Sequence, residues 1–155
     1  MSFLKKLMGM GTSGSEAKKQ EIRKIFDERV TDGPTYATIA AMNMTTTKKL
    51  TEEVRTYYNY LIGYKDAEDP ELVIIVTDHE LSSFDEPVVC KKSECTKADF
   101  IEKTGSFSIT HPAFGDKPLD FSIIASTAWG GYVISVSYVD EYTMFYDFFV
   151  NRFAK

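Results

Sequence analysis

The stretch that decides the fold is the aromatic-rich C-terminus, DEYTMFYDFFVNRFAK (residues 140–155). Its aromatic side chains recur at the spacing of one helix face, with Phe148 off that face. The residues on the face are Tyr142, Phe145, Tyr146, Phe149 and Phe153. Burial of one large apolar side chain contributes about 1.5–3 kcal/mol to folding. We therefore expect this segment to form a helix that supplies much of the core.

The ends of this helix carry recognisable signals. Asp140 is the expected N-cap, and Glu141 follows in the first turn, where a negative charge is favourable. Arg152 and Lys155 lie in the last turn, where a positive charge is favourable. The pattern predicts an amphipathic helix that begins at Asp140.

Upstream, the chain is typical of β-structure because it is rich in β-branched and aromatic residues. The clearest strand is the aliphatic run Glu71–Thr77, and the turn-like residues 65–70 would join it to the preceding strand as a hairpin. Trp129, Gly130 and Gly131 predict a second tight turn. The expected strands are Tyr36–Thr46, Val54–Tyr64, Glu71–Thr77, Pro87–Lys91, Ser106–His111, Leu119–Ser126 and Tyr132–Tyr138, with Thr96–Lys103 a short helix or an irregular strand.

Val54–Tyr64 is the ambiguous segment. Its apolar spacing also fits a helix capped by Thr51, with Glu52 and Glu53 in the first turn. We favour a strand because four tyrosines would crowd a helix but suit a sheet; these are Tyr57, Tyr58, Tyr60 and Tyr64.

The N-terminal region predicts one further helix. Ser13 and Glu16 have capping-box spacing and open a helix to about Val30, which residues 31–34 then stop. Residues 1–14 are expected to be a flexible lead, and residues 15–155 a single globular domain. The lead could make a weak membrane-surface contact through Phe3, Leu4, Lys5, Lys6 and Leu7.

Composition narrows the function classes. The 155 residues are 43% hydrophobic and 26% charged, as in an ordinary globular domain, and no apolar run is long enough for a transmembrane helix. The net charge of −5 argues against general nucleic-acid binding. Cys90 and Cys95 lack the spacing of a zinc site, so we expect reduced thiols in a cytoplasmic protein.

The element order defines an α+β fold: an N-terminal helix, about seven antiparallel strands in a bent sheet or partly open barrel, and a packed C-terminal amphipathic helix. This order resembles the bacterial pleckstrin-homology-like domains, chiefly through Tyr57–Tyr64, Glu71–Thr77 and Glu141–Phe153. The resemblance implies a non-enzymatic interaction domain without a cofactor. In phosphoinositide-binding members the first interstrand loop is basic; its counterpart here is Thr45–Lys49, with Lys48 and Lys49.

A second architecture depends on two segments. If Thr96–Lys103 is a helix and Ser106–His111 is not a strand, the order is similar to the small acidic secretion-chaperone fold, an α/β sandwich. Proteins of that fold form dimers that bind extended partner segments. The acidic balance of the chain suits this alternative.

Acidic residues supply the main candidate binding site. Residues 65–86 hold eight acids and one base, among them Asp66, Glu68, Asp69 and Glu71. The glycine of a calcium-binding EF-hand loop is missing, so no metal is expected there. The sharper hypothesis is an acidic docking surface for a basic protein partner.

Catalytic signals are sparse. No nucleophile elbow, zinc-protease or phosphate-loop motif occurs in the chain. The remaining enzyme hypothesis is a weak hydrolase or metal-dependent enzyme that uses Asp78, His79 and Asp120. We expect His111, which precedes Pro112, to be a turn residue.

Overall fold

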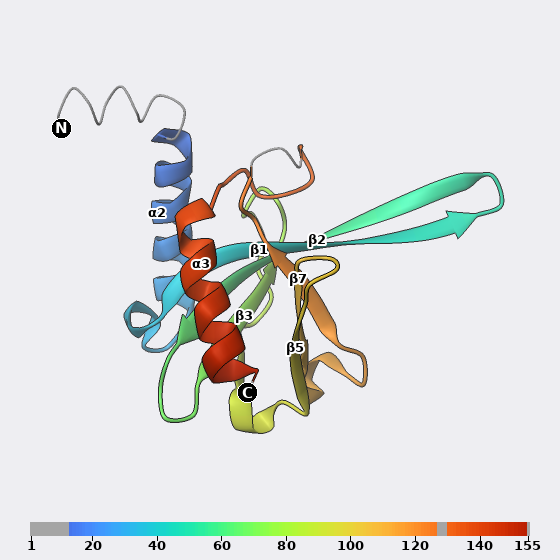
Figure 1. The fold of residues 1–155 in the computed structure, drawn as a ribbon. Helices are drawn as coiled ribbons and strands as arrows, with labels where there is room; N and C mark the ends of the chain where they lie inside the picture. The colour runs from blue at the N-terminus through green and yellow to red at the C-terminus, as the bar shows by residue number, and fades with distance from the viewer. Residues whose placement is uncertain (1–12, 127–129, 155) are drawn as a thin grey trace.

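The computed structural model describes residues 13–126 and 130–154, which form a seven-stranded antiparallel sheet with a helix at each end of the chain (Figure 1). The helices are α2 (Ser13–Arg29) and α3 (Val139–Phe148), and α3 continues into a π-helical turn, η5 (Phe149–Phe153). The strands are β1 (Ala37–Lys49), β2 (Glu52–Lys65), β3 (Glu71–Thr77), β4 (Val88–Lys91), β5 (Lys97–Ile101), β6 (Ser106–Thr110) and β7 (Leu119–Ile123). Short 3₁₀ turns occupy η1 (Gly33–Thr35), η2 (Lys92–Glu94) and η3 (Pro112–Phe114). The predicted α+β class is confirmed.

The sheet curls into a half-barrel. Its strand order is β4-β3-β2-β1-β7-β6-β5, so β4 and β5 are its two edges. Only residues 92–96, which include η2, connect these edges along the chain. A link this short spans at most about 20 Å of extended chain, so the two edges must approach each other. The predicted bent sheet is therefore confirmed.

The strands at the centre of the sheet are buried on both faces, which explains their continuous apolar runs. Phe26 of α2 covers one face at Gly63, where an added Cβ would lie 2.1 Å from the Phe26 ring. On the opposite face, Tyr64 packs edge-on against Phe145 of α3, with 5.1 Å between the ring centroids. Glu71–Thr77 was predicted with its observed bounds, and Val54–Tyr64 is a strand, as favoured.

The C-terminal helix fills the concave side of the half-barrel. Phe107 of β6 packs against Phe145 and Phe149, with centroids 4.9 and 5.0 Å apart. The predicted burial of Phe145, Phe149 and Phe153 is confirmed. Phe148, expected off the buried face, is also buried because Tyr64 of β2 contacts it.

Two predictions about the C-terminal region are wrong. Tyr132–Tyr138 forms no strand; it is an irregular segment on the α2 side of the sheet, where the Ser137 N–H donates to the Ser15 hydroxyl. Tyr132 is exposed, whereas Val133, Ile134, Val136 and Tyr138 are buried. Helix α3 begins at Val139 rather than after an Asp140 cap, and its N-cap Tyr138 makes no side-chain capping bond. Tyr138 is itself buried, and its N–H donates to the carbonyl of Ile124. Tertiary packing therefore sets the start of this helix.

The alternative architecture is also wrong. Thr96–Lys103 contains β5 and no helix, and Ser106–Thr110 is the strand β6 that pairs with it. Both conditions of the secretion-chaperone order therefore fail. Alternating burial explains β6, since Phe107 and Ile109 face the core while their neighbours do not.

Helix α2 confirms the predicted N-terminal helix. Its residues Ile22, Phe26 and the following Val30 are buried against the sheet. The lead residues 1–12 and their predicted membrane contact lie outside the described residues, as do Trp129 and Lys155. Among the described helices, none has the length and apolar content needed to cross a membrane.

Candidate functional site: a two-stranded arm and the cavities at its base

The longest hairpin of the sheet leaves the body of the domain. β1 pairs with β7 only at Ala41 and Met42, whereas β2 pairs with β3 only from Asn59 onward. Residues 43–58 therefore pair only with each other, across the two-residue turn Leu50–Thr51. Figure 1 shows this ribbon projecting far beyond the remaining elements. We call residues 43–58 the arm.

The arm exposes apolar side chains and holds no core. Leu50 at its tip is fully exposed, and Met44, Val54 and Tyr58 are each more than a third exposed. A two-stranded hairpin in water is only marginally stable by itself. Exposed strand edges also pair readily with other chains. The arm thus has the properties of a surface that gains stability when another chain adds to it.

Hydrogen bonding shows which main-chain groups of the arm are free. The carbonyl of Ala40 accepts from the N–H of Ile124, 3.0 Å away, so the main chain of Ala40 faces β7 rather than β2. Along an antiparallel strand this orientation repeats at every second residue. The main-chain groups that face outward along the arm therefore belong to Met44, Thr46 and Lys48 on β1 and to their cross-strand neighbours Tyr57, Arg55 and Glu53 on β2.

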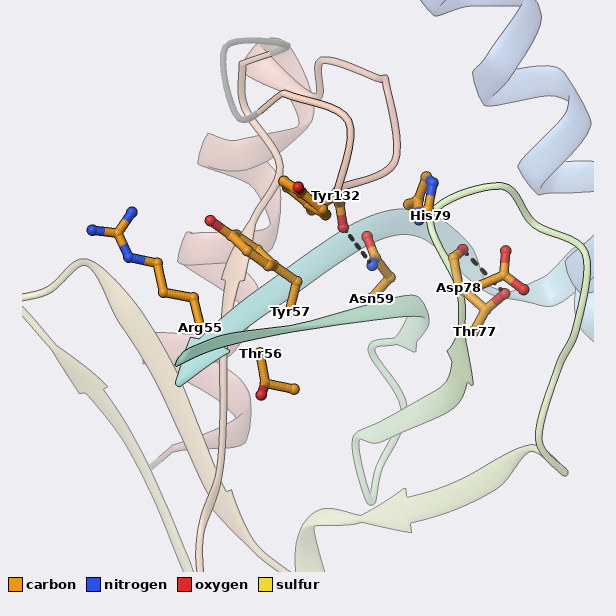
Figure 2. Close-up of a pocket in the computed structure, with 8 residues that line it drawn as sticks. All are labelled: Arg55, Thr56, Tyr57, Asn59, Thr77, Asp78, His79 and Tyr132. Atoms are coloured by element: carbon orange, nitrogen blue, oxygen red, sulfur yellow. Dashed lines mark hydrogen bonds between the residues drawn. The ribbon is translucent and has the colours of Figure 1, made fainter. Parts of the chain in front are cut away.

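A cavity of about 350 Å³ lies where β2 separates from β3, and we call it the β2 fork. Figure 2 shows the stacked rings of Tyr57 and Tyr132 on one side of this cavity and His79 on the other. The rings are 5.0 Å apart and nearly parallel. The residues that line the β2 fork are Arg55, Thr56, Tyr57, Asn59, Thr77, Asp78, His79 and Tyr132.

Asn59 anchors the wall of the β2 fork. It is 3% exposed, and its amide donates to the carbonyl of Tyr132 and accepts from the N–H of Ile134. These bonds, 3.1 and 2.9 Å long, hold the irregular segment against the base of the arm. Figure 2 shows the first of them, from Asn59 to Tyr132. They also satisfy main-chain groups of that segment that a strand ladder would otherwise pair.

A second cavity, of about 370 Å³, lies where β1 separates from β7, and we call it the β1 fork. Its apolar lining comes from Met42, Met44 and Ile101, and its polar lining from Asn43, Thr104, Ser106, Asp120 and Ser122. Asp120 Oδ1 is buried and has no hydrogen-bond partner among the residues that the structure describes. Burial of a carboxylate oxygen without a partner is costly, so this atom would gain from a donor delivered into the fork.

The predicted binding residues Lys48 and Lys49 lie near the tip of the arm. They belong to β1, whose strand continues through the predicted loop Thr45–Lys49; the turn itself is Leu50–Thr51. The β-branched Thr45–Thr47 run favours the extended strand. In the sheet register Lys48 and Lys49 face Glu53 and Glu52. Within the described residues neither lysine has an ion-pair or hydrogen-bond partner.

The predicted acidic residues lie at the opposite end of β2, about 45 Å of strand away. Arg152 Nε donates to Asp66, 2.7 Å away. The Ser93 main chain and hydroxyl donate to Asp69 and lower the pKa of its carboxyl. Glu68 is exposed. These acids therefore mostly bind other parts of the same chain, and the acidic docking surface stays a prediction.

Glu71 also has partners within the domain. The Tyr36 hydroxyl donates to its carboxylate at 3.2 Å, and Lys65 Nζ lies 3.8 Å from it. Burial, followed by the charge of Glu71, raises the pKa of Tyr36 to about 12. The pair links the start of β1 to β3 and is a structural contact.

The residues of the enzyme hypothesis do not meet. Asp78 and His79 line the β2 fork, whereas Asp120 lines the β1 fork. The Asp78 carboxylate accepts from the main chains of Glu80, Ser82 and Ser83 and from both serine hydroxyls, at 2.7–3.0 Å. Chiefly the Ser82 bonds hold the pKa of Asp78 far below its usual value. Asp78 therefore orders the loop after β3.

The remaining candidates have structural roles. His111 Nδ1 accepts from the N–H of Ala113, so it caps η3 as the turn residue expected from the sequence. Burial raises the pKa of Cys90 to about 12 and that of Cys95 to about 11, and both are free thiols. Over residues 13–126 and 130–154, no group of three or more histidine, cysteine, aspartate or glutamate side chains is placed to hold a metal.

Sequence reasoning identified the two strands of the arm but not the arm itself. The sequence does contain a signal: apolar residues fill β1 from Ile39 to Met42, and a polar Thr- and Lys-rich continuation follows. β2 mirrors this change at Asn59, the first buried residue of that strand. A strand much longer than its apolar portion indicates a hairpin that extends beyond the core.

Comparisons of the chain with protein-family models, with curated proteins and with solved structures find no match.

Proposed function

We propose that this chain is a non-enzymatic protein-interaction domain whose arm binds extended partner segments by strand addition along β2. The observation that carries the proposal is the arm itself, a ribbon whose strand edges have no third strand beside them. Edge addition uses main-chain hydrogen bonds for affinity and neighbouring pockets for side-chain selection.

The β2 fork supplies such a pocket. It begins where β3 stops pairing with β2, so an added strand would continue the sheet in the position that β3 vacates. The stacked rings of Tyr57 and Tyr132 suit an apolar or aromatic partner side chain. Arg55 lies beside them, and its Nε donates to Glu53 at 3.1 Å.

A pleckstrin-homology-like assignment is part of this proposal. The half-barrel and the C-terminal helix against its concave side are compatible with that fold. A role as an adaptor agrees with the resemblance, because such domains act through binding. Fold alone does not determine the partner, so the proposal depends on the arm.

A selection experiment tests the binding edge. A phage library of random dodecapeptides is selected against the full chain, and the affinities of the selected synthetic peptides are measured by calorimetry. Arg55→Pro removes an outward N–H of β2, which an edge strand tolerates when that N–H faces solvent. We expect at least about tenfold weaker binding, the loss expected when main-chain bonds of an added strand are broken.

Two control variants separate the edge from other effects. Arg55→Ala removes the same side chain but keeps the N–H, so it should lose less affinity than Arg55→Pro. Thr46→Pro makes the equivalent main-chain change on the β1 side, directly across from Arg55, and should leave peptide binding intact. Peptides that bind Arg55→Pro as tightly as the natural chain would contradict the proposal.

A further inference from the structure

The arm differs from the rest of the chain in its net charge. The arm carries Lys48, Lys49 and Arg55 against Glu52 and Glu53, a balance of +1, whereas the whole chain has −5. The rest of the chain therefore carries −6. A positively charged arm on a negatively charged body is complementary to the body of another copy of the same chain.

The free part of β1 can pair with itself. Residues 43–49 are the part of the strand that β7 leaves unpaired. An antiparallel pairing that uses this whole segment places Thr46 opposite Thr46 of the second copy and Met44 opposite Lys48 of the second copy. The outward main-chain groups belong to Met44, Thr46 and Lys48, so every hydrogen-bonding position of this register meets another.

The same register brings Lys48 of one copy close to Asp120 of the other. Residues directly opposite each other project to the same face of a sheet, so Lys48 of the second copy lies on the face of Met44. Met44 and Asp120 line the same cavity, the β1 fork, and within the described part of the chain Asp120 Oδ1 is buried there without a partner. The lysine side chain is long enough to extend past Met44 into this fork.

We propose that the β1 edges of two copies pair to form a symmetric dimer in which Lys48 of each copy enters the β1 fork of the other and donates to Asp120. The pairing converts two marginal two-stranded arms into one four-stranded ribbon, ordered β2-β1-β1-β2. It leaves both β2 edges free, and it does not require the proposed peptide binding.

Sedimentation equilibrium of the full chain tests the dimer. We expect dimers at about 100 μM protein, within the affinity range of small interfaces. Lys48→Asp and Asp120→Lys should each weaken dimerisation at least about tenfold, because each places like charges in the fork. The double variant Lys48→Asp/Asp120→Lys should recover most of the lost affinity.

Lys49→Asp is the matched control. It changes the arm charge equally and also places an acid opposite a glutamate, here Glu52 instead of Glu53. Its side chain projects to the other face, so the dimer should persist. Circular dichroism establishes that each variant is folded.

Three results would overturn the dimer. The first is a natural chain that stays monomeric throughout the concentration series, which would mean that the β1 edge does not pair with itself. The second is equal loss in Lys48→Asp and Lys49→Asp. The third is folded single variants that dissociate without recovery in the double variant.

Discussion

The body of the sheet and the arm are built from the same two strands but in opposite environments. At Ile39–Met42 and Tyr60–Ile62, β1 and β2 are buried between α2 and α3. In the arm, residues 43–58, the same strands pair with neither β7 nor β3, and among the described residues Tyr132 stacks on the arm only at its base. Strand formation therefore does not depend on burial here. The buried body supplies the stability, and the exposed arm is the region proposed to bind.

A cavity in the core of the body should have the largest effect on the free energy of unfolding. Phe145→Ala removes a ring that contacts Tyr64 on one half of the sheet and Phe107 and Phe121 on the other. We expect the free energy of unfolding to fall by about 3–5 kcal/mol, the usual cost of such a cavity. Urea unfolding measures it. Val54→Ala in the arm is the comparison, and an equal loss there would erase the distinction between the regions.

Alkaline pH should cause the next largest loss of stability, through a buried tyrosine of the body. Burial, followed by the charges of Tyr58 and Asp120, raises the pKa of Tyr60 to about 12. The folded state thus keeps a proton that the unfolded state releases above about pH 10. The stabilisation is complete below pH 10 and is lost as pH rises, by about 2 kcal/mol at pH 12.

Comparison with Tyr60→Phe isolates this contribution. The phenylalanine variant has no proton to lose, so its urea midpoint should fall less between pH 10 and pH 12. Parallel curves for the two proteins would show that Tyr60 titrates as it does in the unfolded chain.

Asn59 marks the boundary between the two regions. Asn59→Ala removes the amide that accepts from the Ile134 N–H and donates to the Tyr132 carbonyl. We expect a loss of about 1–2 kcal/mol, because buried main-chain groups lose their hydrogen bonds. Hydrogen exchange should show faster exchange at Ile134. Unchanged protection there would mean that packing alone holds the irregular segment.

Removal of most of the arm should have the smallest effect on the free energy of unfolding. Replacement of residues 46–55 by Asn-Gly leaves the hydrogen-bonded pair Thr45 and Thr56 closed by a tight hairpin turn. The variant should fold, with the free energy of unfolding changed by less than about 1 kcal/mol, because the removed residues bury little surface. Urea unfolding and circular dichroism test this. An unfolded product would show that the arm belongs to the folding unit.

Sequence patterns predict the buried strands of the body better than the segments whose main chain is bonded by distant side chains. Glu71–Thr77 was predictable because burial on both faces leaves a continuous aliphatic run with polar ends. Tyr132–Tyr138 is also rich in β-branched and aromatic residues, yet Asn59, far away in sequence, bonds its main chain and replaces a strand partner. Short-range patterns identify residues that must be buried, but they do not identify which groups bind the backbone.

The candidate site was less predictable for a related reason. Lys48 and Lys49 were identified, but as a loop, because charge marks exposure without distinguishing a turn from an extended hairpin. The enzyme hypothesis groups Asp120 with Asp78 and His79, but the topology places Asp120 in a different cavity. The strand order is needed to show that the two cavities lie at opposite edges of the β1–β2 hairpin, one beside β1 and the other beside β2.

The link at residues 92–96 has a consequence for how the chain is assembled. Cleavage there would give one fragment that contains β1 to β4 and another that contains β5 to β7 with α3, each a continuous run of neighbouring strands. Their shared ladder has only two residue pairs, Ala41 with Ile123 and Met42 with Ser122. The rings of α3 contact strands of both fragments and would contribute to their affinity, as would the bonds from Asn59 to the segment before α3. The domain is thus suited to fragment complementation, with the C-terminal helix as the element that rejoins the halves.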